Sequence, residues 1–286
     1  MPFFAVQGIS VRFGGLLALD DVDLVVNHSE IVGLIGPNGA GKTTLFNTVS
    51  GVQRPTSGKV VFDGHDVTRA PAHVRSRLGI GRTFQTVKLF PALSVRENIM
   101  IGCHARMKTG LFSDGLHLPR SHWAQRDAKK VVDEILEVLG LTSIDGRLAG
   151  ELPLGQQRLV EIGRALATKP KLLLLDEATS GISKSEVGEL VGLLRSLMDR
   201  YQLSLLVVEH DISLVMNLCD YIYVLDFGRM LASGAPAEVR DDPAVIEAYL
   251  GIVDDGANPA PAQKPSPEEA DQAPVGQEPS LVGSKS

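Results

Sequence analysis

The chain has 286 residues, and its 44% apolar content is typical of a globular protein with a core of ordinary size. A net charge of −6 argues against a nucleic-acid-binding protein, and two cysteines are too few for a disulfide framework. The sequence contains neither an apolar stretch long enough to span a membrane nor a basic and then apolar leader, so we expect a cytoplasmic protein.

A β-rich portion comes first, with expected antiparallel strands at 6–13, 22–26 and 60–63. Between them, the apolar strand 31–35 leads into a glycine-rich loop, and a helix is expected from 42 to 51. The loop reads Gly36, Pro37, Asn38, Gly39, Ala40, Gly41, Lys42, Thr43, with Thr44 following in the same site.

A glycine-rich loop between a strand and a helix is the setting of a phosphate-binding P-loop. Its backbone N–H groups and the helix N-terminus would bind the phosphates of ATP. We expect Lys42 to reach the β- and γ-phosphates and the Thr43 hydroxyl to bind Mg²⁺. The P-loop alone is compatible with ATPases, GTPases and kinases.

The middle of the chain is predicted to be mostly helical, from about 86 to 157, with helices at 95–103 and 124–139. Gln85 ends the strand-like run 79–84, so its amide would reach Mg²⁺ or the attacking water. The stretch 104–123 between the two helices is basic and contains three of the seven histidines. We interpret that stretch as a loop rather than a metal site.

The last third returns to alternating strands and helices, with strands expected at 171–175, 204–208 and 221–225. Asp176 and Glu177 follow an apolar run that is typical of a parallel strand buried on both faces. Asp176 would bind Mg²⁺ through water, and Glu177 would act as general base on the attacking water. His210 follows the next strand, where its imidazole could donate to the γ-phosphate.

Two other classes of nucleotide-dependent protein fit the sequence less well. A GTPase would need a guanine-reading Asn-Lys-x-Asp, which the sequence lacks, and a kinase would need an acceptor site and remains a distant alternative.

Residues 254–286 contain six acidic residues, two lysines and six prolines without an aromatic residue, so we expect a disordered tail from 252 to 286.

Taken in order, these motifs and the segment 152–158, Leu-Pro-Leu-Gly-Gln-Gln-Arg before an expected helix at 159–168, resemble the ATP-binding cassette (ABC) family over about residues 4–251. The resemblance implies an α/β P-loop NTPase fold of the ABC ATPase type. It comprises an antiparallel β-subdomain and an inserted helical subdomain within one domain at 1–251. Arg-Thr-Phe-Gln at 82–85 and Asp-Pro-Ala-Val-Ile-Glu-Ala-Tyr-Leu-Gly at 242–251 resemble the LivG-type ATPases of branched-chain amino acid importers.

The resemblance also implies roles for particular residues. Phe13 would stack on adenine, with a core aromatic of the β-subdomain as the alternative. The signature segment would act on the ATP of a second ATPase subunit through Pro153, Leu154, Gly155 and Gln156. Because the family's usual serine is replaced by Pro153, one hydrogen-bond donor is expected to be missing. The segment 178–183 also lacks the aspartate that is frequent in the family.

The implied function is ATP hydrolysis that drives import of branched-chain amino acids or a relative such as urea or short amides. The implied partners are a second ABC ATPase subunit, identical or different, two transmembrane permease subunits and an extracytoplasmic binding protein, at the cytoplasmic face of the membrane. The alternatives are a lipopolysaccharide-export ATPase and a mechanochemical ABC ATPase of DNA repair or translation. The last class would need a long coiled coil or a tandem second cassette, and the sequence has neither.

Overall fold

The computed structural model describes residues 2–104, 119–179 and 184–254. The strands are β1 Phe4–Phe13, β2 Leu16–Val26, β3 Ile31–Ile35, β4 Ser57–Phe62, β5 His65–Asp66, β6 Ile80–Arg82, β7 Leu172–Asp176, β8 Ser204–Val208, β9 Tyr221–Asp226 and β10 Arg229–Gly234. The helices are α1 Lys42–Ser50, α2 Ala72–Leu78, α3 Val95–His104, α5 Pro119–Val138, α6 Leu154–Leu166, α7 Lys184–Tyr201, α8 Ile212–Leu218, α9 Pro236–Asp241 and α10 Pro243–Asp254.

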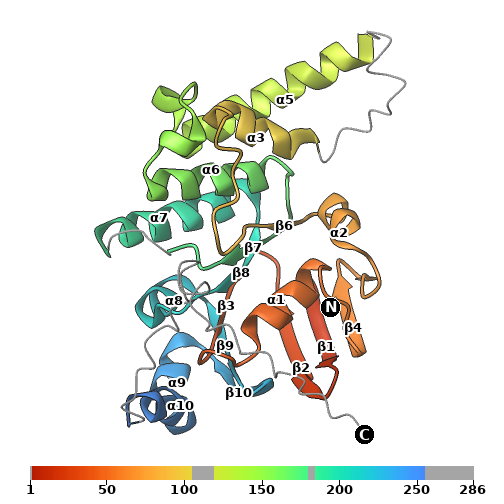
Figure 1. The fold of residues 1–286 in the computed structure, drawn as a ribbon, viewed down its shortest axis with the longest axis vertical. Coiled ribbons are helices and arrows are strands. Elements are labelled where there is room, and N and C mark those ends of the chain that lie inside the picture. The colour runs from red at the N-terminus through yellow and green to blue at the C-terminus, as the bar shows by residue number, and fades with distance from the viewer. Residues whose placement is uncertain (1, 105–118, 180–183, 255–286) are drawn as a thin grey trace, which may run out of the picture.

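A six-stranded sheet in the order β10-β9-β3-β8-β7-β6 forms the centre of the molecule (Figure 1). β3 pairs in parallel with β8 on one side and β9 on the other, and only β10 runs antiparallel to its neighbour. Alternate side chains of β7 enter two different apolar clusters, Leu172 and Leu174 on one face and Leu173 and Leu175 on the other. The prediction that this strand is buried on both faces is therefore confirmed.

The second sheet is four-stranded, in the order β2-β1-β4-β5, and all of its pairings are antiparallel. Its inner face shares one apolar cluster with α1 and with one face of the central sheet, through residues such as Phe4, Leu24, Phe46 and Leu206. The expected antiparallel sheet beside the P-loop strand is confirmed, although β1 and β2 are both longer than predicted. The packing places the β1–β2 hairpin beside the loop that precedes α1.

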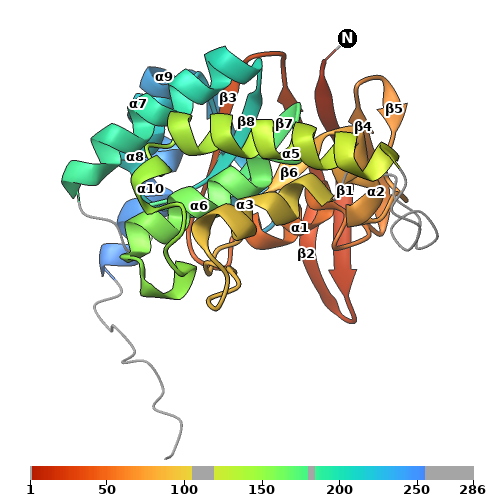
Figure 2. The same cartoon turned by 90° about the horizontal axis from the view of Figure 1, so that it is seen from above.

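Three helices, α3, α5 and α6, gather at one end of the molecule, and α9 and α10 lie at the opposite end (Figure 1). Seen from above, α5 runs across α3 and α6 (Figure 2). We call α3, α5 and α6 the helical layer. The 3-10 turns Thr142–Ile144 and Ala149–Glu151 link α5 to α6.

Two boundaries of the helical layer were predicted wrongly. The helix that follows the signature segment was expected at 159–168 but begins at Leu154, with Pro153 as its N-cap. Gly155 and Gln156 therefore lie in the first helical turn, because proline fixes a φ compatible with entry into a helix. α5 begins at Pro119 rather than at 124. Most of the stretch 104–123 and the whole of the tail from 255 onward lie outside the described residues.

Candidate functional site

The glycine-rich loop connects β3 to α1 and leaves the start of α1 open. Gly41 is the N-cap of α1 at φ 104°, and no side chain caps the helix. A Cβ added at Gly36, where φ is 152°, would lie 2.0 Å from the Leu225 carbonyl oxygen, so β9 permits no side chain there. Gly39, at φ 83°, has no atom within 4 Å of its added Cβ and faces open space. The loop therefore presents backbone N–H groups on a side that a ligand can approach.

Lys42 folds back over this loop. Its Nζ donates to the carbonyl oxygens of Gly36 at 2.6 Å and Pro37 at 2.9 Å. Burial lowers the pKa of the Lys42 ammonium, and the charge of Glu177 acts in the opposite direction. Lys42 and Glu177 are thus close enough for the charge of one to act on the other.

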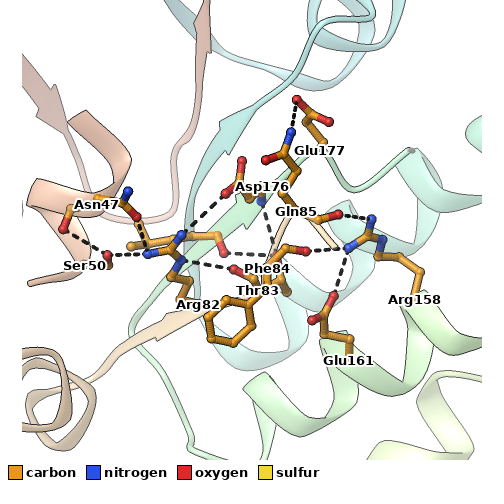
Figure 3. A network of polar contacts seen from close by, with 11 residues as sticks. Asn47, Ser50, Arg82, Thr83, Phe84, Gln85, Arg158, Glu161, Asp176 and Glu177 are labelled. Carbon is orange, nitrogen blue, oxygen red and sulfur yellow. Dashed lines mark hydrogen bonds and ion pairs between the residues drawn. The ribbon is translucent and has the colours of Figure 1, made fainter. Parts of the chain in front are cut away.

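Asp176 ends β7 and is nearly buried, at 4% exposure. Figure 3 shows its carboxylate facing Arg82, whose Nη2 lies 3.5 Å from the Asp176 Oδ2. Burial raises the pKa of Asp176, and Arg82 partly offsets that effect. The same guanidinium donates to Asn47 and Ser50 on α1, at 2.8 Å each. Arg82 therefore connects the P-loop helix to the strand that carries the aspartate.

Glu177 adopts φ 47°, a left-handed conformation that is uncommon for a residue other than glycine and marks many functional sites. Its backbone N–H donates to the Val208 carbonyl oxygen at 2.9 Å, which holds Glu177 at the carboxyl ends of β7 and β8. The Gln85 Nε2 donates to the Glu177 Oε1 at 3.1 Å (Figure 3). The predicted base and the predicted glutamine are thus brought together from two different loops.

His210 is less closely involved in this cluster. Its side chain is 63% exposed, and its Nδ1 lies 3.8 Å from the Oε2 of Glu209. Glu209 is fully buried and accepts from the backbone N–H and the hydroxyl of Thr179, at 2.9 Å each. Within the described part of the chain, no hydrogen bond or ion pair joins His210 to the P-loop or to Glu177. Thr179 and Glu209 tie together the two loops that carry Glu177 and His210.

Two further predicted elements lie apart from this cluster in the described residues. Phe13, at the end of β1, is 48% exposed and pairs across the hairpin with Leu16. It is therefore not a core aromatic, which removes the alternative interpretation of this residue. The signature residues Pro153 and Leu154 are also exposed, and no side chain caps the start of α6.

Three residues with no predicted role are part of the site's support. Arg82 was noted in the sequence only as part of Arg-Thr-Phe-Gln, and Arg158 only as part of the signature segment. Tyr249 on α10 reaches the P-loop: burial raises the pKa of its hydroxyl to about 12, and a hydrogen bond with the Gly36 backbone has the smaller, opposite effect. No local sequence signal identifies the two arginines, because their partners lie on distant segments of the chain.

The donor set fits a nucleotide with Mg²⁺. Uncapped N–H groups and Lys42 suit phosphates, and a single buried carboxylate beside hydroxyl and amide side chains suits Mg²⁺, which is usually bound by one or two carboxylates together with substrate phosphates. Across the described ranges, no group of three or more His, Cys, Asp or Glu could hold a metal by itself. The same residues contain no helix long and apolar enough to cross a membrane.

Comparison with known proteins gives two family matches. Residues 19–180 match the family described as ABC transporter, and residues 229–255 match the one described as branched-chain amino acid ATP-binding cassette transporter. The second match includes Tyr249.

Two curated relatives and one solved structure are similar over most of the chain. LivG of Salmonella typhimurium, a high-affinity branched-chain amino acid transport ATP-binding protein, is 43% identical over 87% of this chain and 98% of its own length. BraF of Pseudomonas aeruginosa, which has the same description, is 40% identical over the same shares. The ADP conformation of MJ1267, an ATP-binding cassette of an ABC transporter, superposes with a TM-score of 0.75 at 32% identity, covering 88% of this chain and 99% of that one.

Proposed function

The chain belongs to the ABC transporter family of ATPases, and from that premise we propose that it drives import of branched-chain amino acids or a related small polar solute. The observation that carries the choice of solute is the match of residues 229–255 to the branched-chain amino acid transporter family. The identity of 40–43% to BraF and LivG supports the same choice. Both favour import over the lipopolysaccharide-export alternative.

We propose that the triphosphate lies on the uncapped N-terminus of α1. Lys42 would leave the Gly36 and Pro37 carbonyl oxygens and pair with the β- and γ-phosphates. Gly39, Ala40 and the backbone up to Thr44 would supply N–H groups, and Phe13 would stack on the adenine. Asp176, which faces Arg82, would hold Mg²⁺ through water together with Thr43 and Gln85. When bound, Mg²⁺ would neutralise the charge that develops on the phosphates.

For the chemical step, Glu177 would take a proton from the attacking water. Gln85, which donates to the Glu177 carboxylate, would orient that water and respond to the γ-phosphate. His210 would donate to the γ-phosphate after a movement of its loop, because its side chain is exposed in this structure. The left-handed backbone of Glu177 would direct the carboxylate outward from the end of β7.

We propose that the site is completed by a second ATPase subunit. The start of α6 has no side-chain cap, so the N–H groups of Leu154, Gly155 and Gln156 would be available to the γ-phosphate of ATP held by that partner. Two permease subunits and an extracytoplasmic binding protein would complete the importer. The chain would then work at the cytoplasmic face of the membrane, attached through the permeases.

Uptake of labelled leucine tests this proposal. Cells lacking the gene should lose most high-affinity leucine uptake. The wild-type chain should restore it, whereas a Lys42→Ala chain produced at the same level should not. Lys42→Ala removes a charge-assisted phosphate contact and not a core residue. Normal leucine uptake together with a loss of lipopolysaccharide from the cell surface of the deletion strain would contradict import and favour lipopolysaccharide export.

A further inference from the structure

The backbone around Gln85 is held by a buried ion pair on α6. Arg158 and Glu161, one helical turn apart, are 2% and 1% exposed, and the Arg158 Nη1 donates to Glu161 at 2.9 Å. The Arg158 guanidinium also donates to the carbonyl oxygens of Phe84 at 2.7 Å and Gln85 at 3.0 Å (Figure 3). Glu161 in turn accepts from the Lys88 backbone N–H at 3.3 Å. Residues 84–88, which we call the Gln loop, are thus attached at both ends to α6.

The segment that follows the Gln loop is attached to the same helical layer. Asn98 on α3 is fully buried; its Oδ1 accepts from the Phe90 N–H at 2.9 Å, and its Nδ2 donates to the Phe90 carbonyl oxygen at 3.0 Å. The Gln85 side chain points away from the helical layer and donates to Glu177 at the carboxyl end of β7. Gln85 therefore contacts Glu177 through its side chain and the helical layer through its carbonyl oxygen.

The helices of the helical layer pack closely against one another. A Cβ added at Gly102 on α3 would lie 2.1 Å from the Arg164 carbonyl oxygen on α6. A Cβ added at Gly163 would lie 2.9 Å from Leu139, just beyond α5. Toward α7 the packing is looser, because a cavity of about 440 Å³ borders α6 there, lined in part by Val138, Leu139, Leu159, Leu190 and Leu193.

We propose that Arg158 is a positioning residue that converts a displacement of Gln85 into a displacement of α6. The signature residues lie at the N-terminus of that helix, so a γ-phosphate that attracts the Gln85 side chain would also reposition the groups offered to the partner's ATP. Glu161 fixes the guanidinium and binds the far end of the Gln loop. This inference rests on the proposed binding of ATP at the P-loop.

Substituting one member alone would confuse positioning with folding. Arg158→Met would leave the buried Glu161 with only the weaker ion pair to Arg164, whose Nη2 lies 3.8 Å from the Glu161 Oε1, and breaking a buried pair is strongly destabilising. Replacing both members with apolar side chains of similar length, as in Arg158→Met/Glu161→Met, is frequently neutral for stability. The double variant should therefore unfold within a few degrees of wild type while its Gln loop carbonyl oxygens lack the guanidinium.

Hydrogen exchange of the whole chain, with and without MgATP, tests the inference in the Glu177→Gln background to prevent turnover. With Arg158 and Glu161 intact, ATP should change the exchange rates of the P-loop and also those of residues 152–160, by at least about threefold. In the double variant, only the P-loop rates should change. Arg158→Lys, which keeps a donor and the charge, should restore part of the response at 152–160.

Two results would overturn the inference. One is an equal ATP-dependent change at 152–160 in the double variant. The other is a double variant with Glu177 intact that retains both the thermal stability of the wild type and the full turnover of the assembled complex. That result would show that the ion pair has only a structural role. The exchange of the P-loop reports nucleotide binding separately, and no transported solute is present. A failure of the proposed ATP binding would therefore be visible as unchanged P-loop exchange in the Glu177→Gln sample with Arg158 and Glu161 intact.

Discussion

Replacing Glu177 with glutamine should separate nucleotide binding from hydrolysis. The amide oxygen can still accept the hydrogen bond from the Gln85 Nε2, now 3.1 Å away, so the loop geometry should persist. The negative charge that acts on Lys42 disappears, which favours an incoming triphosphate. ATP affinity should therefore stay equal or increase by up to about tenfold, corresponding to about 1.4 kcal/mol.

Hydrolysis should respond in the opposite direction. General-base catalysis contributes about 10²–10⁴-fold in rate, or about 2.7–5.5 kcal/mol of barrier, so turnover of the assembled transporter should fall by at least a hundredfold. Binding is measured with a fluorescent ATP analogue on the purified chain, and turnover by phosphate release from the reconstituted complex. Glu177→Asp, which keeps a carboxylate, should retain more activity than Glu177→Gln. Turnover of Glu177→Gln within twofold of wild type would refute the assignment of the base.

Three further predictions concern the loops around the site. Gly36→Ala should lower the free energy of unfolding, measured with denaturant, by about 2–5 kcal/mol, because its Cβ would meet the Leu225 carbonyl oxygen. Gly39→Ala should lower it by only about 1 kcal/mol through backbone strain. Equal effects of the two variants would contradict the steric argument. Burial raises the pKa of Glu209 in the folded state, so the stability of the wild type falls as the pH rises from the ordinary glutamate pKa through that raised pKa. The melting temperature of Glu209→Gln relative to wild type should therefore be highest near pH 8 and fall as the pH is lowered toward about 4.3, the ordinary pKa of glutamate, and a difference independent of pH would contradict this. Pro153→Ser should stabilise α6 by about 0.5–1 kcal/mol as a new N-cap but leave turnover of the assembled complex within about twofold, and a large rise would show that the missing hydroxyl limits hydrolysis.

Much of the fold, and the candidate catalytic residues at the carboxyl ends of the strands, could be predicted from sequence because each carries a local signal. The apolar run ending in Asp176 predicts a doubly buried parallel strand, and the spacing of glycines before Lys42 predicts a loop that wraps phosphates. Such signals depend on neighbours in the chain. They predict that Glu177 and Gln85 belong to one site, and in the structure the two side chains are hydrogen-bonded at 3.1 Å.

The supporting residues could not be predicted in the same way, because their partners are distant in sequence. Arg158 binds carbonyl oxygens more than 70 residues earlier, at Phe84 and Gln85, and nothing near it in the sequence indicates this. α6 begins at Leu154 rather than at the expected 159, because Pro153 is its N-cap and the signature residues form its first turn. Tyr249 reaches the P-loop only through the packing of α10.

The position of β3 has a consequence for synthesis of the protein. This strand, which ends at the P-loop, lies between β8 and β9, so both of its neighbours in the sheet are made long after it. A ribosome-bound chain that ends before residue 204 has β3 without either partner strand, so the backbone N–H and C=O groups of β3 lack their hydrogen bonds within the sheet. The sheet around the P-loop strand can therefore be completed only after β9, which ends at Asp226, has been made.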